Sequence, residues 1–131
     1  MGAGLYLHVP FCRRKCPYCN FYSVPAQPEL LAAYTAAVCR NLRHYGNAAQ
    51  PERVDTVYFG GGTPSLLLPA QIAQILETAA EQFALSADAE ITLEANPATV
   101  TPEQLRELRH AGINRLSLGV QSLSDAQLKR L

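Results

Sequence analysis

The chain has 131 residues, 48% of them hydrophobic, and its 11 acidic and 11 basic residues give a formal net charge of zero. This length fits one domain with a hydrophobic core, and the balanced charge argues against electrostatic capture of nucleic acid or an anionic membrane. No apolar stretch approaches the ~20 residues of a transmembrane segment, and the N-terminus lacks the basic and apolar regions of a signal peptide. We therefore expect a cytoplasmic protein whose thiols stay reduced.

Segments typical of strands and helices alternate four times along the chain. Strands, rich in aliphatic, β-branched and aromatic residues, are expected at residues 5–9, 54–59, 90–94 and 115–120. Helices, with apolar residues every three or four positions, are expected at residues 28–45, 69–83 and 101–111, with a fourth beginning at 124. Gly46 and Gly112 are expected to end the first and third helices.

A helix between every two strands predicts an α/β fold with parallel strands and right-handed crossovers. The spacing of the units is that of a βα barrel rather than of a solenoid. Because four units make half of an eight-fold barrel, we expect residues 1–131 to be the N-terminal part of a truncated barrel. The alternative is a small open α/β sheet that is complete as it stands.

Each predicted strand leads into cysteines, glycines or polar residues, which packing of a hydrophobic core does not require. In parallel α/β folds the carboxyl ends of the strands meet at one edge, where ligands bind. The residues that follow the four strands are three cysteines, then 60–64, 94–97 and 119–122. This coincidence predicts an active site at that edge.

Strand alternation predicts which side chains face this site. The apolar residues of each strand share one face and are expected to pack under the helices: Leu5, Leu7 and Val9, then Ile91 and Leu93, then Leu116, Leu118 and Val120. The opposite faces are expected to surround one ligand with Tyr6, His8, Glu94 and Gln121.

Cys12, Cys16 and Cys19 place three thiols in one short loop. Thiolates suit iron–sulfur clusters or zinc, but structural zinc normally takes four protein ligands. Because Cys39 is expected to be a small core residue, the pattern favours a four-iron cluster with one iron open to a substrate or cofactor.

Two alternatives concern the surroundings of this loop. A zinc-stabilised structural domain would need His8 or His44 to complete the metal site. The basic residues 13–15 either offset the charge of an anionic cluster or form a solvated loop.

The segment from Gly60 to Pro64 offers backbone that a ligand can approach closely, because glycine has no Cβ. It lacks the lysine of a phosphate-binding P-loop, so amine or ribose binding fits better. Glu94 can accept hydrogen bonds from ribose hydroxyls or be a surface carboxylate, and Gln121 has a similar but weaker interpretation.

Taken together, four strings resemble the radical S-adenosylmethionine (SAM) superfamily: "LYLHVPFCRRKCPYCNFYS", "YFGGGTPSLL", "LEANP" and "RLSLGVQSL". Within it they resemble the oxygen-independent coproporphyrinogen III oxidase-like group, which includes the HemW-type heme chaperones. The resemblance covers nearly the whole chain and implies the N-terminal half of a TIM-like barrel.

The resemblance also implies the cofactors and the residues that bind them. Cys12, Cys16 and Cys19 would hold a [4Fe–4S] cluster whose open iron binds SAM, and an electron from a flavodoxin- or ferredoxin-type donor would cleave SAM to a hydrogen-abstracting radical. Tyr18 would lie against the adenine and Gln121 would line the same cavity. The other implied SAM contacts are Tyr6, Gly61, Gly62, Thr63 and Glu94.

One departure from the group narrows the function. The oxidases carry a further cysteine shortly after the third ligand, where this chain has Asn20, Phe21 and Tyr22. This favours the HemW-type branch and heme binding and transfer, with coproporphyrinogen oxidation as the alternative. Since the family's later strands have no counterpart here, we expect the chain alone to be inactive and poorly stable.

Overall fold

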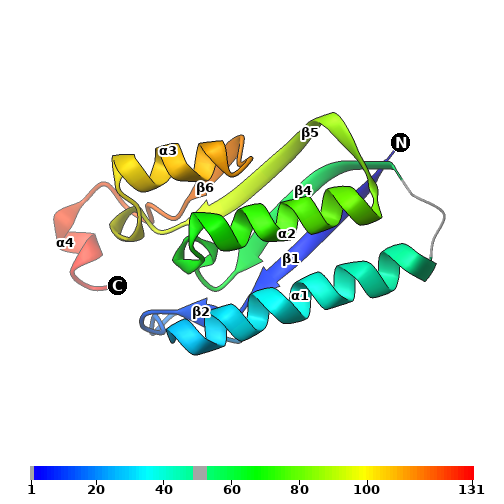
Figure 1. Ribbon diagram of the computed structural model, residues 1–131. Coiled ribbons are helices and arrows are strands. Elements are labelled where there is room, and N and C mark those ends of the chain that lie inside the picture. Colours follow the sequence, from blue (N-terminus) through cyan, green and yellow to red (C-terminus); the bar gives the residue numbers. More distant parts are fainter. Residues whose placement is uncertain (1, 49–52) are drawn as a thin grey trace.

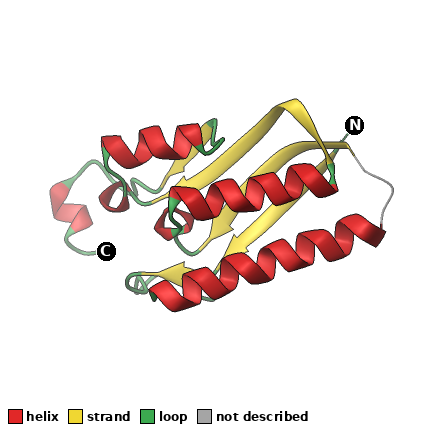
Figure 2. Ribbon diagram, viewed as in Figure 1, coloured by secondary structure: helices red, strands yellow, loops and turns green. Residues whose placement is uncertain are grey.

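The computed structural model describes residues 2–48 and 53–131 and shows an α/β fold with a four-stranded parallel sheet (Figure 1). The strands, in spatial order, are β1 (Ala3–Val9), β4 (Arg53–Gly61), β5 (Ala84–Ala95) and β6 (Arg115–Leu118). Three helices lie over one face of this sheet (Figure 2): α1 (Pro28–Ala48), α2 (Pro69–Gln82) and α3 (Pro102–His110). The predicted α/β class with parallel strands is confirmed.

Shorter elements complete the fold. The cysteine loop lies between β2 (Phe11–Cys12) and β3 (Val24–Pro25), which pair in parallel. The other short elements are η1 (Pro64–Leu66), η2 (Pro97–Thr99) and α4 (Asp125–Leu128). Among the described residues, no helix is both long and apolar enough to cross a membrane.

The hydrophobic core lies between the sheet and the helices. Val9, Phe59 and Leu93, from three neighbouring strands, are fully buried, and α2 adds Ile72 and Ile75. Full burial of one such side chain stabilises the fold by about 1.5–3 kcal/mol. The predicted alternation is confirmed for β1 and β5, where the apolar residues are the ones that pack against the core.

The same prediction was wrong for β6. Leu116 and Leu118 are 39% and 49% exposed instead of packed under helices, and Val120, predicted as part of this strand, lies beyond its end and is 43% exposed. The described sheet gives β6 a neighbour on one side only, α3 packs against α2, and a groove lined by Leu105 and Leu116 separates α3 from β6. Alternation therefore predicts which side chains share a face, but not whether another element covers that face.

Gly46 does not end the first helix, because α1 continues to Ala48. A Cβ at Gly46 would lie 2.5 Å from the Cβ of Gln82 in α2, so the glycine permits close packing of two helices. Gly112, by contrast, has a φ of 115° and follows the end of α3 as predicted.

The third strand is longer than predicted. β5 begins at Ala84 rather than at Glu90, and its register against β4 shifts between Val54 and Thr56. Residues 84–89 are mostly small or polar and show no clear alternation, which is why no strand was predicted there.

Candidate functional site

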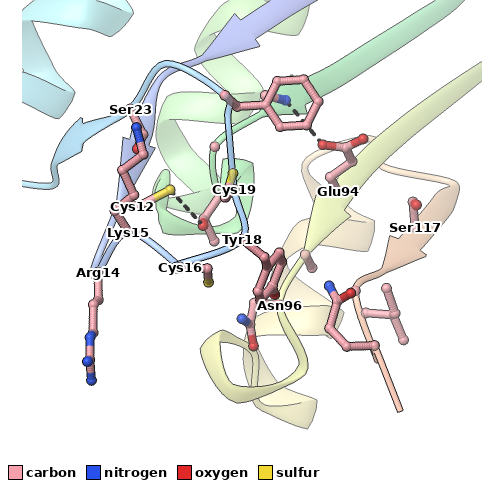
Figure 3. A pocket seen from close by; sticks show the side chains of 18 residues that line it. Cys12, Arg14, Lys15, Cys16, Tyr18, Cys19, Ser23, Glu94, Asn96 and Ser117 are labelled. Atoms are coloured by element: carbon pink, nitrogen blue, oxygen red, sulfur yellow. Dashed lines mark hydrogen bonds between the residues drawn. The ribbon is translucent and has the colours of Figure 1, made fainter. Parts of the chain in front are cut away.

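A cavity of about 320 Å³ opens at the carboxyl end of the sheet, at the predicted edge (Figure 3). The cysteine loop, the turn after β4, the end of β5 and the chain leaving β6 all line it. Of the residues singled out as cluster ligands or SAM contacts, all but Tyr6 lie around this cavity: Cys12, Cys16, Tyr18, Cys19, Gly61, Gly62, Thr63, Glu94 and Gln121.

Tyr6 lies outside the cavity on the uncovered face of the sheet. Its side chain is 60% exposed, its hydroxyl lies 3.1 Å from Nδ1 of His8, and its ring stacks on Tyr58 with centroids 6.1 Å apart. Because Tyr58 contacts Glu94, Tyr6 is connected to the cavity through one intervening ring. Its direct contact with a cofactor stays a prediction.

The cysteine loop is anchored at its start. The N–H of Ala26 donates to the carbonyl of Cys12 at 3.1 Å, and this bond belongs to the pairing of β2 with β3. Cys16 and Cys19 lie further along, in a turn closed by a 3.0 Å bond from the N–H of Cys19 to the carbonyl of Cys16. All three thiols are free and half-buried.

The donor set, three free thiols in one loop, is of the kind that iron–sulfur clusters use. Across residues 2–48 and 53–131, no three His, Cys, Asp or Glu groups lie close enough to share one ion. A four-iron cluster does not need such convergence, because each cysteine binds a different iron. Cys39 is 1% exposed in α1, so the prediction that it is a core residue is confirmed, and His44 is exposed.

Tyr18 presents a neutral aromatic ring beside the cysteines. Its pKa is raised, first by a hydrogen bond with the Cys16 side chain and then by burial and the nearby Cys16 and Cys19, so the phenol stays protonated near neutral pH. Arg14 and Lys15 line the outer part of the cavity and are exposed, and Arg14 points away from the cysteines (Figure 3). This favours the solvated-loop interpretation of the basic residues.

The turn after β4 uses its backbone donors within the protein. The N–H of Gly61 donates to Glu94 at 3.1 Å, that of Gly62 to the last residue of β1 at 2.8 Å, and that of Thr63 to Phe11 at 2.7 Å. Gly61 has a φ of 114°, and a Cβ at Gly62 would lie 2.6 Å from the carbonyl oxygen of Phe11. With these donors occupied, the turn is not built as a phosphate cradle, which agrees with the preference for an amine or a ribose.

Glu94 is half-buried at the end of β5 and held by two donors. The Tyr58 hydroxyl donates to Oε1 at 2.7 Å and the Gly61 N–H to Oε2 at 3.1 Å. The pKa of Tyr58 is raised, first by its hydrogen bond to Glu94 and then by burial. A carboxylate has about four lone-pair sites, so Glu94 retains acceptor capacity for a ligand hydroxyl.

Sequence reasoning did not single out Tyr58. The available signal was alternation along β4, which places Tyr58 on the same face as Gly60. Phe21 and Ser23 also line the cavity without having been expected there, whereas Asn96 lies in the 94–97 segment that was expected at this edge. Asn96 has a local role as well, because its side chain accepts a 2.9 Å hydrogen bond from the N–H of Ala98.

Gln121 forms the last wall of the cavity. Its φ is 62°, which makes it the only non-glycine residue in the described ranges with a positive φ. This conformation is uncommon for a residue with a Cβ and often marks a functional position.

A parallel sheet whose carboxyl edge carries three free thiols and a glycine turn defines a class of protein. Residues 6–131 match the sequence profile of the Radical SAM superfamily, and the chain belongs to this superfamily. A solved structure, described as coproporphyrinogen III oxidase (HemN) from Escherichia coli, a radical SAM enzyme, superposes with a TM-score of 0.87 and 32% identity. The match covers 96% of this chain and 29% of that chain.

Curated relatives refine this class to a HemN/HemW-like radical SAM protein. The chain is 43% identical to the heme chaperone HemW of Escherichia coli (strain K12), over 98% of this chain and 34% of the relative. It is 41% identical to the mitochondrial radical S-adenosyl methionine domain-containing protein 1 of Mus musculus, over 98% and 29%. The chain thus spans about a third of the length of these relatives.

Proposed function

We propose that this chain is the cofactor-binding part of a HemW-type heme chaperone, with a [4Fe–4S] cluster on Cys12, Cys16 and Cys19 and SAM beside it. The observation that carries the proposal is the cavity, which joins three free thiols to the Gly61–Thr63 turn and to Glu94. Membership of the radical SAM superfamily supports both cofactors.

Different residues around the cavity are proposed to contact different parts of SAM. Glu94, oriented by two internal donors, accepts hydrogen bonds from the ribose hydroxyls. The N–H groups of the turn after β4 already donate within the protein, and the Thr63 carbonyl already accepts from the N–H of Leu66, so the carbonyl oxygens of Gly61 and Gly62 are the proposed acceptors for the amine. Tyr18 offers its neutral ring to the adenine and Gln121 closes the far side. When bound, the reduced cluster supplies the electron that cleaves SAM.

Heme is the proposed partner. Asn20, Phe21 and Tyr22 stand where the oxidases carry a further cysteine, and relatives named heme chaperone HemW are about 40% identical to this chain. The likeness to coproporphyrinogen III oxidase supports the alternative, oxidative decarboxylation of coproporphyrinogen. A flavodoxin- or ferredoxin-type electron donor and a cytoplasmic location remain parts of the proposal.

Anaerobic reconstitution of the purified protein with iron and sulfide tests the cluster. We expect about four irons and four sulfides per chain, and loss of the cluster when Cys12, Cys16 or Cys19 is changed to serine. Cys39→Ala is the matched control and should keep the cluster, since Cys39 is buried away from the cavity. A colourless protein that holds zinc instead would contradict the proposal.

Because residues 1–131 alone are expected to be inactive, titration with hemin is done on the full-length protein, where it separates the two functions. Saturable heme binding without turnover of coproporphyrinogen supports the chaperone. Decarboxylation of coproporphyrinogen, with no heme bound at matching concentrations, would favour the oxidase.

A further inference from the structure

The side chain of Thr63 makes an unexpected contact. Its Oγ1 donates a hydrogen bond to Sγ of Cys12 over 3.6 Å, drawn as a dashed line in Figure 3. Thr63 occupies the N-cap position of η1, where a threonine oxygen commonly accepts a bond from a backbone N–H. Here the Thr63 side chain makes no capping bond, and its hydroxyl donates to the cysteine instead.

Backbone ties hold this contact in place. The N–H of Thr63 donates to the carbonyl of Phe11, the residue directly before Cys12, at 2.7 Å. Gly62 makes a similar 2.8 Å bond to the end of β1, and Ala26 donates to the carbonyl of Cys12. Both ends of the hydroxyl–sulfur contact are therefore fixed by main-chain bonds on either side of it.

The missing Cβ of Gly62 makes this approach possible. A Cβ there would lie 2.6 Å from the carbonyl oxygen and 3.0 Å from the nitrogen of Phe11, both of them backbone atoms. The glycine turn thus brings the Thr63 hydroxyl to the first cysteine in addition to lining the cavity.

We propose that Thr63 raises the reduction potential of the cluster by donating its hydroxyl hydrogen to the Cys12 thiolate. The inference rests on the proposed function, in which Cys12 is a cluster ligand. Reduction adds one electron, supplied by an external donor, to the cluster and its thiolates, and no proton leaves Thr63. Because the donor's partial positive charge stabilises the more negative reduced state more strongly, hydrogen bonds to the sulfurs raise the potential.

Thr63 acts through Cys12 and is a positioning residue, so the decisive readout is a potential rather than an activity. We would reconstitute wild-type protein, Thr63→Val and Thr63→Ser, and titrate each anaerobically while following the signal of the reduced cluster by electron paramagnetic resonance. Ser23→Ala is the matched control, because it removes another cavity hydroxyl for which the structure shows no bond to a cysteine among the described residues.

Thr63→Val should lower the equilibrium constant for reduction about tenfold, which is a shift of about 59 mV to more negative potential for a one-electron couple. Thr63→Ser and Ser23→Ala should stay at the wild-type potential. Should the valine variant not assemble a cluster, Thr63→Ala compared with Thr63→Ser gives the same test.

A failure of the inference about Thr63 can be distinguished from a failure of the proposed function. Unchanged potentials in variants that lack the hydroxyl, or an equal shift in Ser23→Ala, would overturn the inference and leave the proposed function intact. A wild-type protein that assembles no cluster would overturn the proposed function itself.

Discussion

At the amino edge of the sheet, Asp55 accepts hydrogen bonds from the N–H of Gly2 at 2.9 Å, from Nε of Arg53 at 2.6 Å and from the Ser86 hydroxyl at 2.7 Å. At the carboxyl edge, Glu94 accepts two bonds from the chain and borders the cavity. One carboxylate joins β4 to the strands on either side of it, whereas the other keeps capacity for a ligand. The comparison suggests that the amino edge serves stability and the carboxyl edge serves binding.

Glu94→Gln should have the largest effect, which is weaker binding of SAM at the carboxyl edge. The change replaces the charged carboxylate that is proposed to accept hydrogen bonds from the ribose hydroxyls with a neutral amide. Hydrogen bonds to charged groups are worth about 1.5–3 kcal/mol, or roughly 10- to 150-fold in affinity. Equilibrium binding of SAM to the reconstituted protein measures the effect. Glu90→Gln is the control, since Glu90 lies on the same strand but pairs with Arg115 outside the cavity; equal losses in both variants would contradict the assignment.

Tyr58→Phe should weaken SAM binding less, by about 2- to 10-fold, because it removes one neutral donor that orients Glu94. The ring remains and should still stack on Tyr6. Combining Tyr58→Phe with Glu94→Gln tests the coupling, and the double variant should bind no more weakly than Glu94→Gln alone. Additive losses would mean that Tyr58 acts independently of Glu94.

Asp55→Asn should lower the midpoint of urea unfolding at neutral pH without changing SAM affinity. Asparagine keeps one acceptor oxygen but loses the negative charge and the second oxygen, and the two oxygens of Asp55 serve three donors that belong to the protein itself. Glu94→Gln should show the opposite pattern, with a change in binding and little change in unfolding. An Asp55 variant with weakened SAM binding and normal unfolding would reverse the roles of the two edges.

The smallest expected effect is the pH dependence of the difference in stability between wild type and Asp55→Asn. The pKa of Asp55 is lowered from 3.8, chiefly by its hydrogen bond with Arg53 and then by that with Ser86. Since the folded pKa lies below the unfolded one, the ionised form stabilises the protein fully above the unfolded pKa, and this contribution disappears as the pH falls through the folded pKa. The urea midpoints of wild type and Asp55→Asn should therefore converge in acid; a constant gap would contradict the assignment.

The contrast between these edges also shows what the sequence could predict. The cysteines, the glycine turn and Glu94 follow predicted strands directly, so chain order and strand polarity were enough to bring them to one edge. The role of Asp55 was not predictable in this way, because its partners Gly2 and Ser86 are 53 and 31 residues away. Such contacts depend on register, which the irregular start of β5 obscures.

Gly46 and β6 illustrate the same limit in packing. Gly46 has the signature of a helix end, but the nearby Gln82 of another helix decides its role. Leu116 and Leu118 have the alternation of a covered strand, but burial depends on an element that would have to lie over them. Local patterns predicted the elements and the site, whereas close approaches between distant segments required the structure.

The most direct test of the central claim is the electron paramagnetic resonance spectrum of the reduced, reconstituted protein with and without SAM. If the carboxyl-edge cavity holds a cluster on Cys12, Cys16 and Cys19 with an iron open to SAM, the spectrum should show a [4Fe–4S] signal that changes when SAM is added. Glu94→Gln should need more SAM for the same change. A cluster signal that SAM leaves unaltered at saturating concentration, or no cluster signal at all, would contradict the account.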